Sequence, residues 1–485
     1  MAKSKMTIFT MAMMTSAAIM SLRGLPVIAK EEFTLFFYIA FATFLFLVPA
    51  ALVAAELGGM FGEKEGGVYT WVKEAFGRRL GFVAIWLQWV QNVVWYPTVL
   101  AFAAATFAYV IGADKLANSG IYTGLFCIVF YWLATWVSLR GGNLIERITS
   151  YGFVAGSILP ALVLLLLAVI WMMQGNPIGF QHLPAAQGAV DTVINNHVHP
   201  RLFPHIRGLS DIAFLSGVLL LFAGVEVHAV HANKMARPQA QYPLALFLTS
   251  IIVFVLFTLG AFAISAIMPY NDINVESGLL QAFQTVFNRI NMPWAVALVG
   301  VLVMFGALAS VTSWIIGPSR GLLKTAQDGL LPVFWAKTNA QGVQANILLV
   351  QAVIVTLLSG VYFITKNVSV AFFLIGAMTI TLYLIMYALM YAAGIRLRYK
   401  RPDMKRIFCV PGGMPGMWLA AVVGIGGVLF SFIVAFFPPS QLPVGNPAQY
   451  VLLVAAGTIL FSLAPFFIKG PSNAKKFPHS NQECA

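Results

Sequence analysis

Two charged side chains fall deep inside stretches that are otherwise apolar. Arg23 follows the apolar run 6–20, within the segment SLRGLP, and Glu226 follows the apolar run 218–222. An ionised side chain in hydrocarbon costs about 2.5 to 3.5 kcal/mol on insertion scales, so such residues indicate an ion pair or a functional site. Two interpretations stay open. In the structural interpretation, Arg23 and Glu226 form an ion pair, or the Glu226 carboxyl group stays neutral. In the functional interpretation, Glu226 titrates and Arg23 binds a substrate carboxylate.

Both charges lie where a membrane helix would be broken. Ser21, Arg23 and Gly24 precede a proline in the first span, and Glu226 ends a small-residue segment in the sixth. Free N–H groups from Gly24 onward could hold a carboxylate, and unwound carbonyls of residues 223–225 could accept hydrogen bonds from an ammonium group. The residues that carry these carbonyls are Ala223, Gly224 and Val225. This is a site shaped for an amino acid, although glycine is also a common packing device in membrane helices.

Two histidines follow the second break at a spacing of three residues. His228 and His231 would share one helical face, and a histidine can sense acid pH because its ordinary pKa is near 6.5. The alternative is an interfacial hydrogen-bonding role. Glu226 and His228 are the candidates for proton coupling. No cysteine or carboxylate cluster accompanies the histidines, and residues 197, 199 and 205 hold three more on the other side of the membrane, so we expect no metal and no other cofactor.

Aromatic residues in later spans are candidates for a gate or a substrate platform. Trp314 falls in the eighth span, and Tyr383 and Tyr387 fall one helical turn apart in the tenth. Because aromatic residues make up 13% of the chain, packing is the alternative role for all three.

The elements that position these residues are transmembrane helices. The chain has 485 residues, of which 60% are apolar and 9% charged, whereas soluble proteins carry roughly 25% charged residues. Apolar stretches of about 20 residues recur along it, and each is long enough to cross a bilayer. The sequence therefore predicts an all-α polytopic membrane protein with about twelve spans: 6–29, 33–55, 81–111, 121–139, 148–173, 209–233, 243–268, 293–323, 344–365, 369–394, 417–437 and 448–468.

The basic residues sort by side of the membrane. With both termini cytoplasmic, 22 of the 29 Lys and Arg residues lie inside, six lie outside and Arg23 lies within a span. The net charge of +13 is thus a topology signal and does not indicate nucleic acid binding. Spans one and six stand five helices apart, which predicts two halves of inverted topology, 1–173 and 209–394, followed by two more helices within 417–468 and a short cytoplasmic tail, 469–485.

Several function classes lack their sequence signs. The chain has no GxxxxGK[ST] phosphate loop, no TVGYG-like filter, no Arg-rich voltage-sensor helix and no GxSxG nucleophile motif. We therefore expect a secondary transporter and not an enzyme. A channel or a substrate sensor is the alternative from another class.

Several motifs resemble the amino acid/polyamine/organocation transporter superfamily and, within it, the bacterial glutamate/GABA antiporters. They are EGGVYTWV (65–72), FAGVE (222–226), SWIIGPSRG (313–321), TAQ (325–327), LLP (330–332), RPDMKR (401–406) and VPGG (410–413). The resemblance implies a leucine-transporter-like fold of 5 + 5 inverted repeats plus two helices, in the bacterial inner membrane, with exchange by alternating access. It also implies that Glu226 contributes to gating, that Trp314 closes over substrate, and that Tyr383 and Tyr387 line the path.

The departures from that family concern the site. Arg23 stands where the glutamate/GABA antiporters have an uncharged aromatic residue, Ser310 stands where they have a glutamate, and their long C-terminal plug has no counterpart here. Both substitutions make the site less negative, which favours a substrate with an additional carboxylate. We expect exchange of glutamate or a related small amino acid for its decarboxylation product or another amino acid. Proton-coupled uptake is the alternative mode, and a homo-oligomer is compatible with the sequence.

Overall fold

The structure is a computed structural model, and the residues that it describes are 5–141, 143–181, 202–204, 209–275, 277–364, 368–438 and 447–468. These residues form helices throughout, with one isolated backbone bridge between Met6 and Met235. The all-α fold predicted from composition is confirmed. The predicted tail 469–485 and the three histidines at 197, 199 and 205 lie outside the described residues.

Ten continuous helical segments of the described chain are long and apolar enough to cross a membrane. They are α3–η1–α4 (Thr34–Ala42, Thr43–Leu47, Val48–Met60), α6 (Arg78–Val110), α7 (Gly120–Leu139), α8–η3–α9 (Asn143–Phe153, Val154–Ile158, Leu159–Met173), α11 (Pro238–Ile267), α13 (Ala295–Gln327), α14–α15 (Ala345–Ser359, Val361–Ile364), α16 (Val368–Lys400), α17 (Gly413–Val434) and α18 (Pro447–Phe467).

The two remaining spans are interrupted, as the sequence predicted. Span one consists of α1 (Ile8–Ile19) and α2 (Gly24–Ala29), and span six consists of α10 (Leu209–Leu221) followed by the 3₁₀ segment η5 (Val227–Lys234). At about 1.5 Å per residue, none of these pieces alone covers the roughly 30 Å of hydrocarbon. The two breaks therefore leave backbone at mid-membrane depth, which is tolerated only where protein or a cavity surrounds it.

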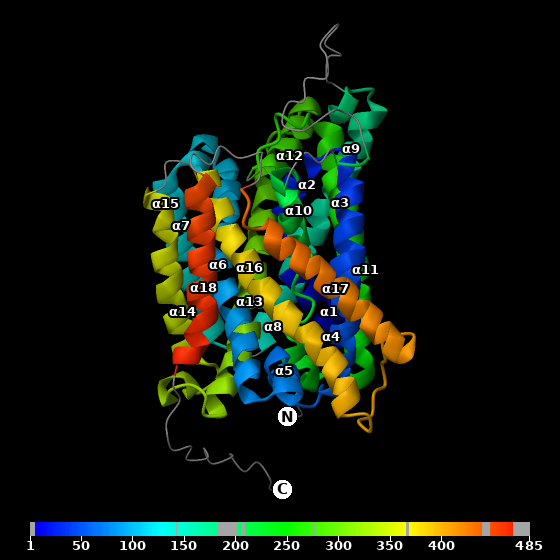
Figure 1. Cartoon of the computed structure of the whole chain (residues 1–485). Helices are drawn as coiled ribbons and strands as arrows, with labels where there is room; N and C mark the ends of the chain where they lie inside the picture. The colour runs from blue at the N-terminus through cyan, green and yellow to red at the C-terminus, as the bar shows by residue number, and fades with distance from the viewer. Residues whose placement is uncertain are drawn as a thin grey trace.

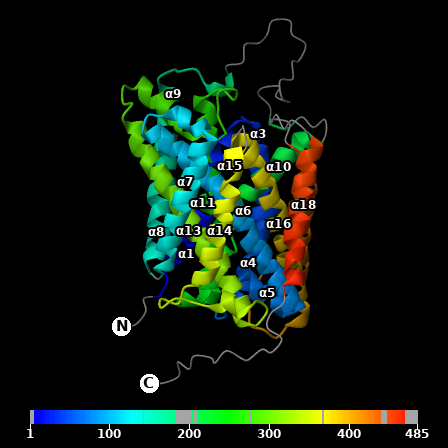
Figure 2. The same cartoon turned by 90° about the vertical axis from the view of Figure 1, so that its left-hand side faces the viewer.

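The helices differ in how deeply they are enclosed. The apolar window of α6 is 78% buried within the protein, whereas that of α18 is 22% buried. Helix α6 packs on both α13 and α16, and α18 stands at the outside of the bundle (Figures 1 and 2). Helices α6, α13 and α16 thus form the interior against which the broken spans lie.

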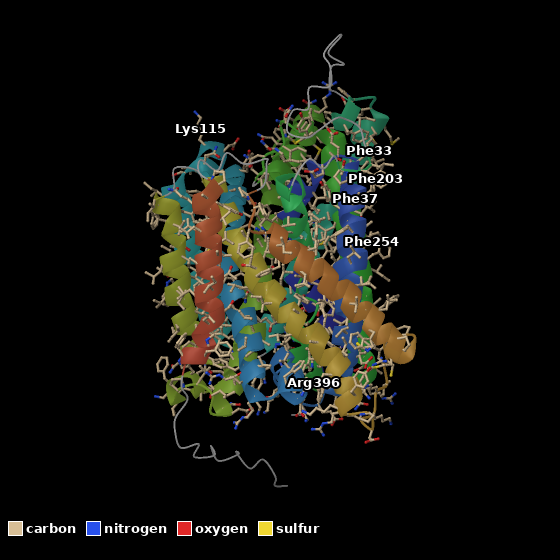
Figure 3. The ribbon with its side chains drawn as sticks, viewed as in Figure 1. Phe33, Phe37, Lys115, Phe203, Phe254 and Arg396 are labelled. Carbon is tan, nitrogen blue, oxygen red and sulfur yellow. The ribbon has the colours of Figure 1, made fainter. Side chains whose placement is uncertain are left out.

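Two basic residues that the predicted topology places on opposite sides of the membrane lie at opposite ends of the bundle. Figure 3 labels Lys115 at the upper face and Arg396 at the lower face, the face that also carries α5 (Val68–Phe76). Helix α5 is a short helix at that face.

The lower face is stabilised by ion pairs around α5. The Lys73 ammonium lies 2.5 Å from a carboxylate oxygen of Asp328, and the Tyr69 hydroxyl donates to the same oxygen at 2.7 Å. Burial alone would raise the pKa of the Asp328 carboxyl, but these two hydrogen bonds and the positive charges of Lys73 and Lys324 lower that pKa below its ordinary value of 3.8. The ionised form is therefore the form that holds α5 to the end of α13.

A buried carboxylate near the lower end of α4 was missed in the sequence. Glu56 is 2% exposed and lies 2.5 Å from Arg398 and 3.3 Å from Arg406, and it accepts a hydrogen bond of 2.7 Å from the Val410 N–H. The predicted second span ended at residue 55, so Glu56 was assigned to a loop. Helix α4 continues to Met60 and places Glu56 inside the packed protein. Arg23 and Glu226 are thus not the only buried charges.

Some helix boundaries also differ from the prediction. Helix α11 begins at Pro238, five residues before the predicted start, and α16 runs to Lys400, six residues beyond the predicted end. The stretch 269–292, which lies between the predicted spans 243–268 and 293–323, contains α12 (Gly278–Arg289), whose residues Leu279 and Phe283 are buried. Its apolar face is only one stripe wide, and a search for membrane spans passes over such a helix.

A candidate substrate site between the two broken helices

The two breaks meet at a small pocket in the interior of the bundle. Its volume is about 20 Å³, and its wall combines residues of both breaks with residues of α6, α13 and α16. A space of this size holds about one water molecule. The lining residues are Ala18, Ile19, Ser21, Arg23, Gln91, Trp95, Leu220, Leu221, Ala223, Trp314 and Tyr383.

Arg23 contributes the positive charge of this pocket. Its side chain is buried, and one guanidinium nitrogen donates to the Thr98 hydroxyl at 3.2 Å. The guanidinium carbon lies 6.0 Å from the centre of the Trp95 ring, within the range of a cation–π contact. Arg23 is thus positioned by α6 in the wall of the pocket, and its contact with a substrate stays a prediction.

Glu226 is enclosed by hydrogen-bond donors of the protein. One carboxylate oxygen accepts from the Gln88 amide at 2.8 Å and from the Tyr383 hydroxyl, and the other accepts from the Tyr387 hydroxyl at 2.5 Å. The side chain is 1% exposed and does not line the pocket. Both oxygens act as acceptors, an arrangement suited to the ionised carboxylate.

The predicted mutual ion pair of Arg23 and Glu226 is not among the ion pairs of the described residues. Each charge has its own partners, Thr98 and Trp95 for Arg23 and a set of neutral donors for Glu226. The pairing hypothesis rested on sequence position alone, and it did not include the polar side chains that α6 places beside each charge.

Gly224 permits the close packing of the second break. Its φ of +119° is in the region that favours glycine, and a Cβ at this position would lie 3.0 Å from the Trp314 ring. Its N–H donates to the Tyr387 hydroxyl at 2.8 Å. The neighbouring Val225 is fully buried, and Ala223 faces the pocket. Glycine is therefore required here both by backbone conformation and by contact.

The first break differs from its prediction. The Gly24 N–H donates to the Ser21 carbonyl at 3.0 Å, and the Leu25 N–H donates to the Leu22 carbonyl at 3.1 Å. These two groups were predicted to be free for a carboxylate, but a tight turn between α1 and α2 satisfies them. A Cβ at Gly24 would meet Leu221 at 2.7 Å, so the glycine acts in packing. The residues of this break that reach the pocket are Ser21 and Arg23.

Trp314 and Tyr383 close the remaining side of the pocket. The Trp314 indole N–H donates to the Ala18 carbonyl at the end of α1 at 2.8 Å. Its ring meets Tyr383 edge to face with ring centres 5.9 Å apart, and it lies 5.6 Å from the Trp95 ring. Tyr383 in turn donates to Glu226. Of the three predicted platform residues, Trp314 and Tyr383 are thus in the wall, and Tyr387 lies behind it on α16.

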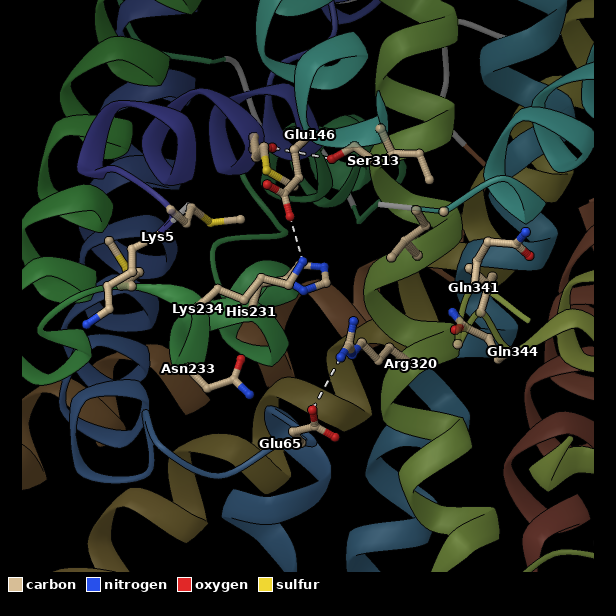
Figure 4. Close-up of a pocket in the computed structure, with 18 residues that line it drawn as sticks. Lys5, Glu65, Glu146, His231, Asn233, Lys234, Ser313, Arg320, Gln341 and Gln344 are labelled. Carbon is tan, nitrogen blue, oxygen red and sulfur yellow. Dashed lines mark hydrogen bonds and ion pairs between the residues drawn. The ribbon is translucent and has the colours of Figure 1, made fainter. Parts of the chain in front are cut away.

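A wide vestibule lies between this wall and the lower face. It has a volume of about 710 Å³ and is lined by residues of α1, α8, η5 and α13 (Figure 4). Two ion pairs cross it, Lys234 with Glu146 at 2.5 Å and Arg320 with Glu65 at 3.2 Å. Ser313 lines the vestibule while the next residue, Trp314, lines the pocket. Consecutive residues of α13 thus face the two spaces.

The two histidines lie at the inner end of the vestibule. His228 approaches the Ser313 hydroxyl at 3.1 Å through its Nε2, and its ring is 6.0 Å from that of His231. His231 lines the vestibule, and both rings are buried. Lys234 and Arg320 also line the vestibule. The contact with Ser313 fits the hydrogen-bonding alternative for His228, and pH sensing stays a prediction.

Comparison with known proteins gives the family of this architecture. The family model described as "Amino acid permease" matches residues 6–461. The chain belongs to the amino acid permease family. It is 37% identical to an uncharacterised transporter, lpg1691, of Legionella pneumophila over 100% of this chain and 99% of that one.

Further relatives have more specific names. A glutamate/gamma-aminobutyrate antiporter of Lactococcus lactis is 29% identical, over 96% of this chain and 91% of the relative. A probable agmatine/putrescine antiporter, AguD, of the same species is 23% identical, over 95% of this chain and 93% of the relative. The predicted membership of this transporter superfamily is confirmed.

The candidate site includes α6 residues that were not predicted from the sequence. Gln91 and Trp95 line the pocket, Thr98 binds Arg23 and Gln88 binds Glu226. Polar residues spaced three, four or seven apart within an apolar span were the available signal. Ser310, in contrast, is buried on α13 but is not among the residues that line the pocket, and Ser313 makes the contacts that cross between helices.

Proposed function

We propose that this permease is an antiporter that exchanges glutamate, or a related acidic or small zwitterionic amino acid, for its decarboxylation product or another amino acid. The observation that supports this most directly is the buried Arg23 guanidinium in the wall of the pocket between the two broken helices. A guanidinium there can form charge-assisted hydrogen bonds with a carboxylate.

The distribution of charge supports an acidic substrate. Arg23 lines the pocket, while the Glu226 carboxylate is turned toward Gln88 and the tyrosines of α16. Two opposite charges would cancel if both faced the ligand, but here the pocket wall carries the positive one. By Coulomb's law this favours a ligand with a net negative charge and disfavours a diamine. Gln91 and Ser21 add neutral hydrogen-bonding groups for an amino acid.

The size of the two spaces supports alternating access. A pocket of about 20 Å³ is too small for an amino acid, whereas the vestibule of about 710 Å³ is large enough. Substrate entry then requires Trp314 and the end of α1, which are joined by a hydrogen bond, to separate. In this proposal the lower face is cytoplasmic in a bacterial inner membrane, and 1–173 and 209–394 are the inverted repeats that move relative to each other.

The test is counterflow in liposomes. Purified protein is reconstituted with an unlabelled amino acid inside and labelled glutamate outside, at acidic and neutral pH, with empty liposomes as the control. The proposal predicts glutamate uptake that requires an internal amino acid. Uptake into empty liposomes under a proton gradient would replace it with symport, and no uptake in either case would contradict glutamate as substrate.

A further inference from the structure

The hydroxyl of Tyr387 joins two parts of span six. It donates to a carboxylate oxygen of Glu226 at 2.5 Å and accepts the Gly224 N–H at 2.8 Å. Tyr387 is fully buried on α16 and is not among the residues that line the pocket. Its hydroxyl is therefore placed to hold the protein's own backbone.

We propose that Tyr387 is a positioning residue, which holds the unwound segment of span six in its substrate-binding conformation by linking the Glu226 carboxylate to the Gly224 N–H. This inference deepens the proposed function, because Ala223 in the same segment lines the pocket. It also assigns Glu226 an indirect role, since the carboxylate orients the hydroxyl and the hydroxyl fixes the backbone.

The unwound segment needs such a link. Between α10 and η5 the helical hydrogen-bond ladder is interrupted, and Gly224 has a φ of +119°. A backbone N–H buried without a partner costs about 1 to 3 kcal/mol, and glycine resists conformational change less than any other residue. The Tyr387 hydroxyl accepts a hydrogen bond from this N–H and donates one to Glu226, which lies two residues after Gly224 in the same segment.

The direction of the hydrogen bonds explains why a carboxylate suits this position. The Tyr387 oxygen accepts from Gly224 and directs its own hydrogen to Glu226. The second Glu226 oxygen is occupied by Gln88 and Tyr383. A carboxamide would place an NH₂ group against one of these donors, because only one of its two terminal atoms accepts.

The same helix offers a matched control. Tyr391 lies one turn beyond Tyr387, is equally buried, and directs its hydroxyl to the Phe46 carbonyl at 3.4 Å. Tyr387→Phe and Tyr391→Phe thus remove the same atom from the same helix, and only the first removes the link to Gly224.

The first experiment needs no substrate. Hydrogen–deuterium exchange is measured by mass spectrometry on peptides that cover residues 218–230, in the full-length protein in detergent or nanodiscs. We expect Tyr387→Phe to exchange there about tenfold faster than wild type, the effect of losing roughly one hydrogen bond. Tyr391→Phe is expected to match wild type in these peptides. Equal exchange in the two variants would overturn the proposal.

The second experiment measures the kinetics of amino-acid transport in the liposomes of the counterflow test. We expect Tyr387→Phe to raise KM about tenfold with a smaller change in maximal rate, because the binding conformation is less populated. Tyr391→Phe is expected to keep the wild-type KM. A fall in maximal rate at unchanged KM would contradict positioning. If the wild type transports no amino acid, the proposed function fails, while the deuterium experiment still decides the role of Tyr387.

A further variant covers the case in which Tyr387→Phe does not fold. Glu226→Gln keeps the Tyr387 hydroxyl and replaces one carboxylate oxygen by an NH₂ group. The donors Gln88, Tyr383 and Tyr387 are then left with one acceptor atom in place of two. We expect hydrogen–deuterium exchange in residues 218–230 to be faster in Glu226→Gln than in wild type as well. Wild-type exchange in this variant would show that the carboxylate does not act through the segment and would overturn the proposal.

Discussion

The two interrupted spans each bring one charged residue into the membrane, but they use it differently. At the first break, Arg23 is held by Thr98 and Trp95 in the wall of the pocket. At the second break, Glu226 points away from the pocket into a set of protein donors. The comparison indicates that one charge is available to select the substrate and the other stabilises the structure that binds it.

Removing the Arg23 guanidinium has the largest expected effect. We expect Arg23→Ala to raise the KM for glutamate on the order of 30-fold and the KM for glutamine only a few-fold, because a hydrogen bond to a charged group contributes about 1.5 to 3 kcal/mol. The measurement is counterflow with both substrates. Arg23→Lys is the matched control, since it keeps the charge and loses the planar fork. Equal losses for both substrates would show that Arg23 does not read a side-chain carboxylate.

Neutralising Glu226 is expected to act on all substrates alike. Glu226→Gln should raise KM about tenfold for glutamate and for glutamine, because the residue acts through Tyr387 and Gln88. Competition assays with a panel of amino acids measure this ratio. A selective gain for acidic substrates would mean that Glu226 faces the ligand during the cycle. Exchange that persists without accumulation would instead favour proton-coupled symport.

Trp314 connects the first break to α13. We expect its substitution to reduce transport less than the changes at Arg23 and Glu226, and to affect all substrates alike. Trp314→Phe keeps an aromatic ring and removes the indole hydrogen bond to the Ala18 carbonyl. We expect exchange to fall about fivefold, equivalent to roughly 1 kcal/mol. Trp95→Phe is the comparison variant, because the Trp95 ring contacts the Trp314 ring and lies beneath Arg23. If Trp314→Phe changes nothing, the indole N–H does not hold α1 and α13 together.

The smallest effect is expected at the lower face, outside both breaks. Asp328 has a lowered pKa, so its ionised form stabilises the fold at neutral pH, and this contribution is lost as pH falls below about 4. Asp328→Asn should lower stability at pH 7 by about 1 kcal/mol or less and reduce the loss of stability in acid. Thermal unfolding of the detergent-solubilised protein at several pH values measures this. Substrate discrimination should not change.

The sequence by itself determined the class of protein and the location of the breaks. Apolar runs of about 20 residues admit one solvent, the bilayer, and the interruptions around Arg23 and Glu226 follow from residues that cannot continue a membrane helix unaided. The motifs around Trp314 further identified the family. These features are local in the chain, and for that reason the sequence showed them directly.

Only the tertiary structure decided which groups each charge meets. Gln88, Thr98 and Tyr387 are far from Arg23 and Glu226 in sequence, and α6 and α16 bring them into contact through helix packing. The same packing separated the two charges that the sequence had paired, and it gave the Gly24 N–H a partner within its own turn. A charged side chain in a membrane requires a polar partner, but the sequence contains several polar groups that could serve and does not distinguish among them. The choice among them depends on which helices are neighbours and which faces they present.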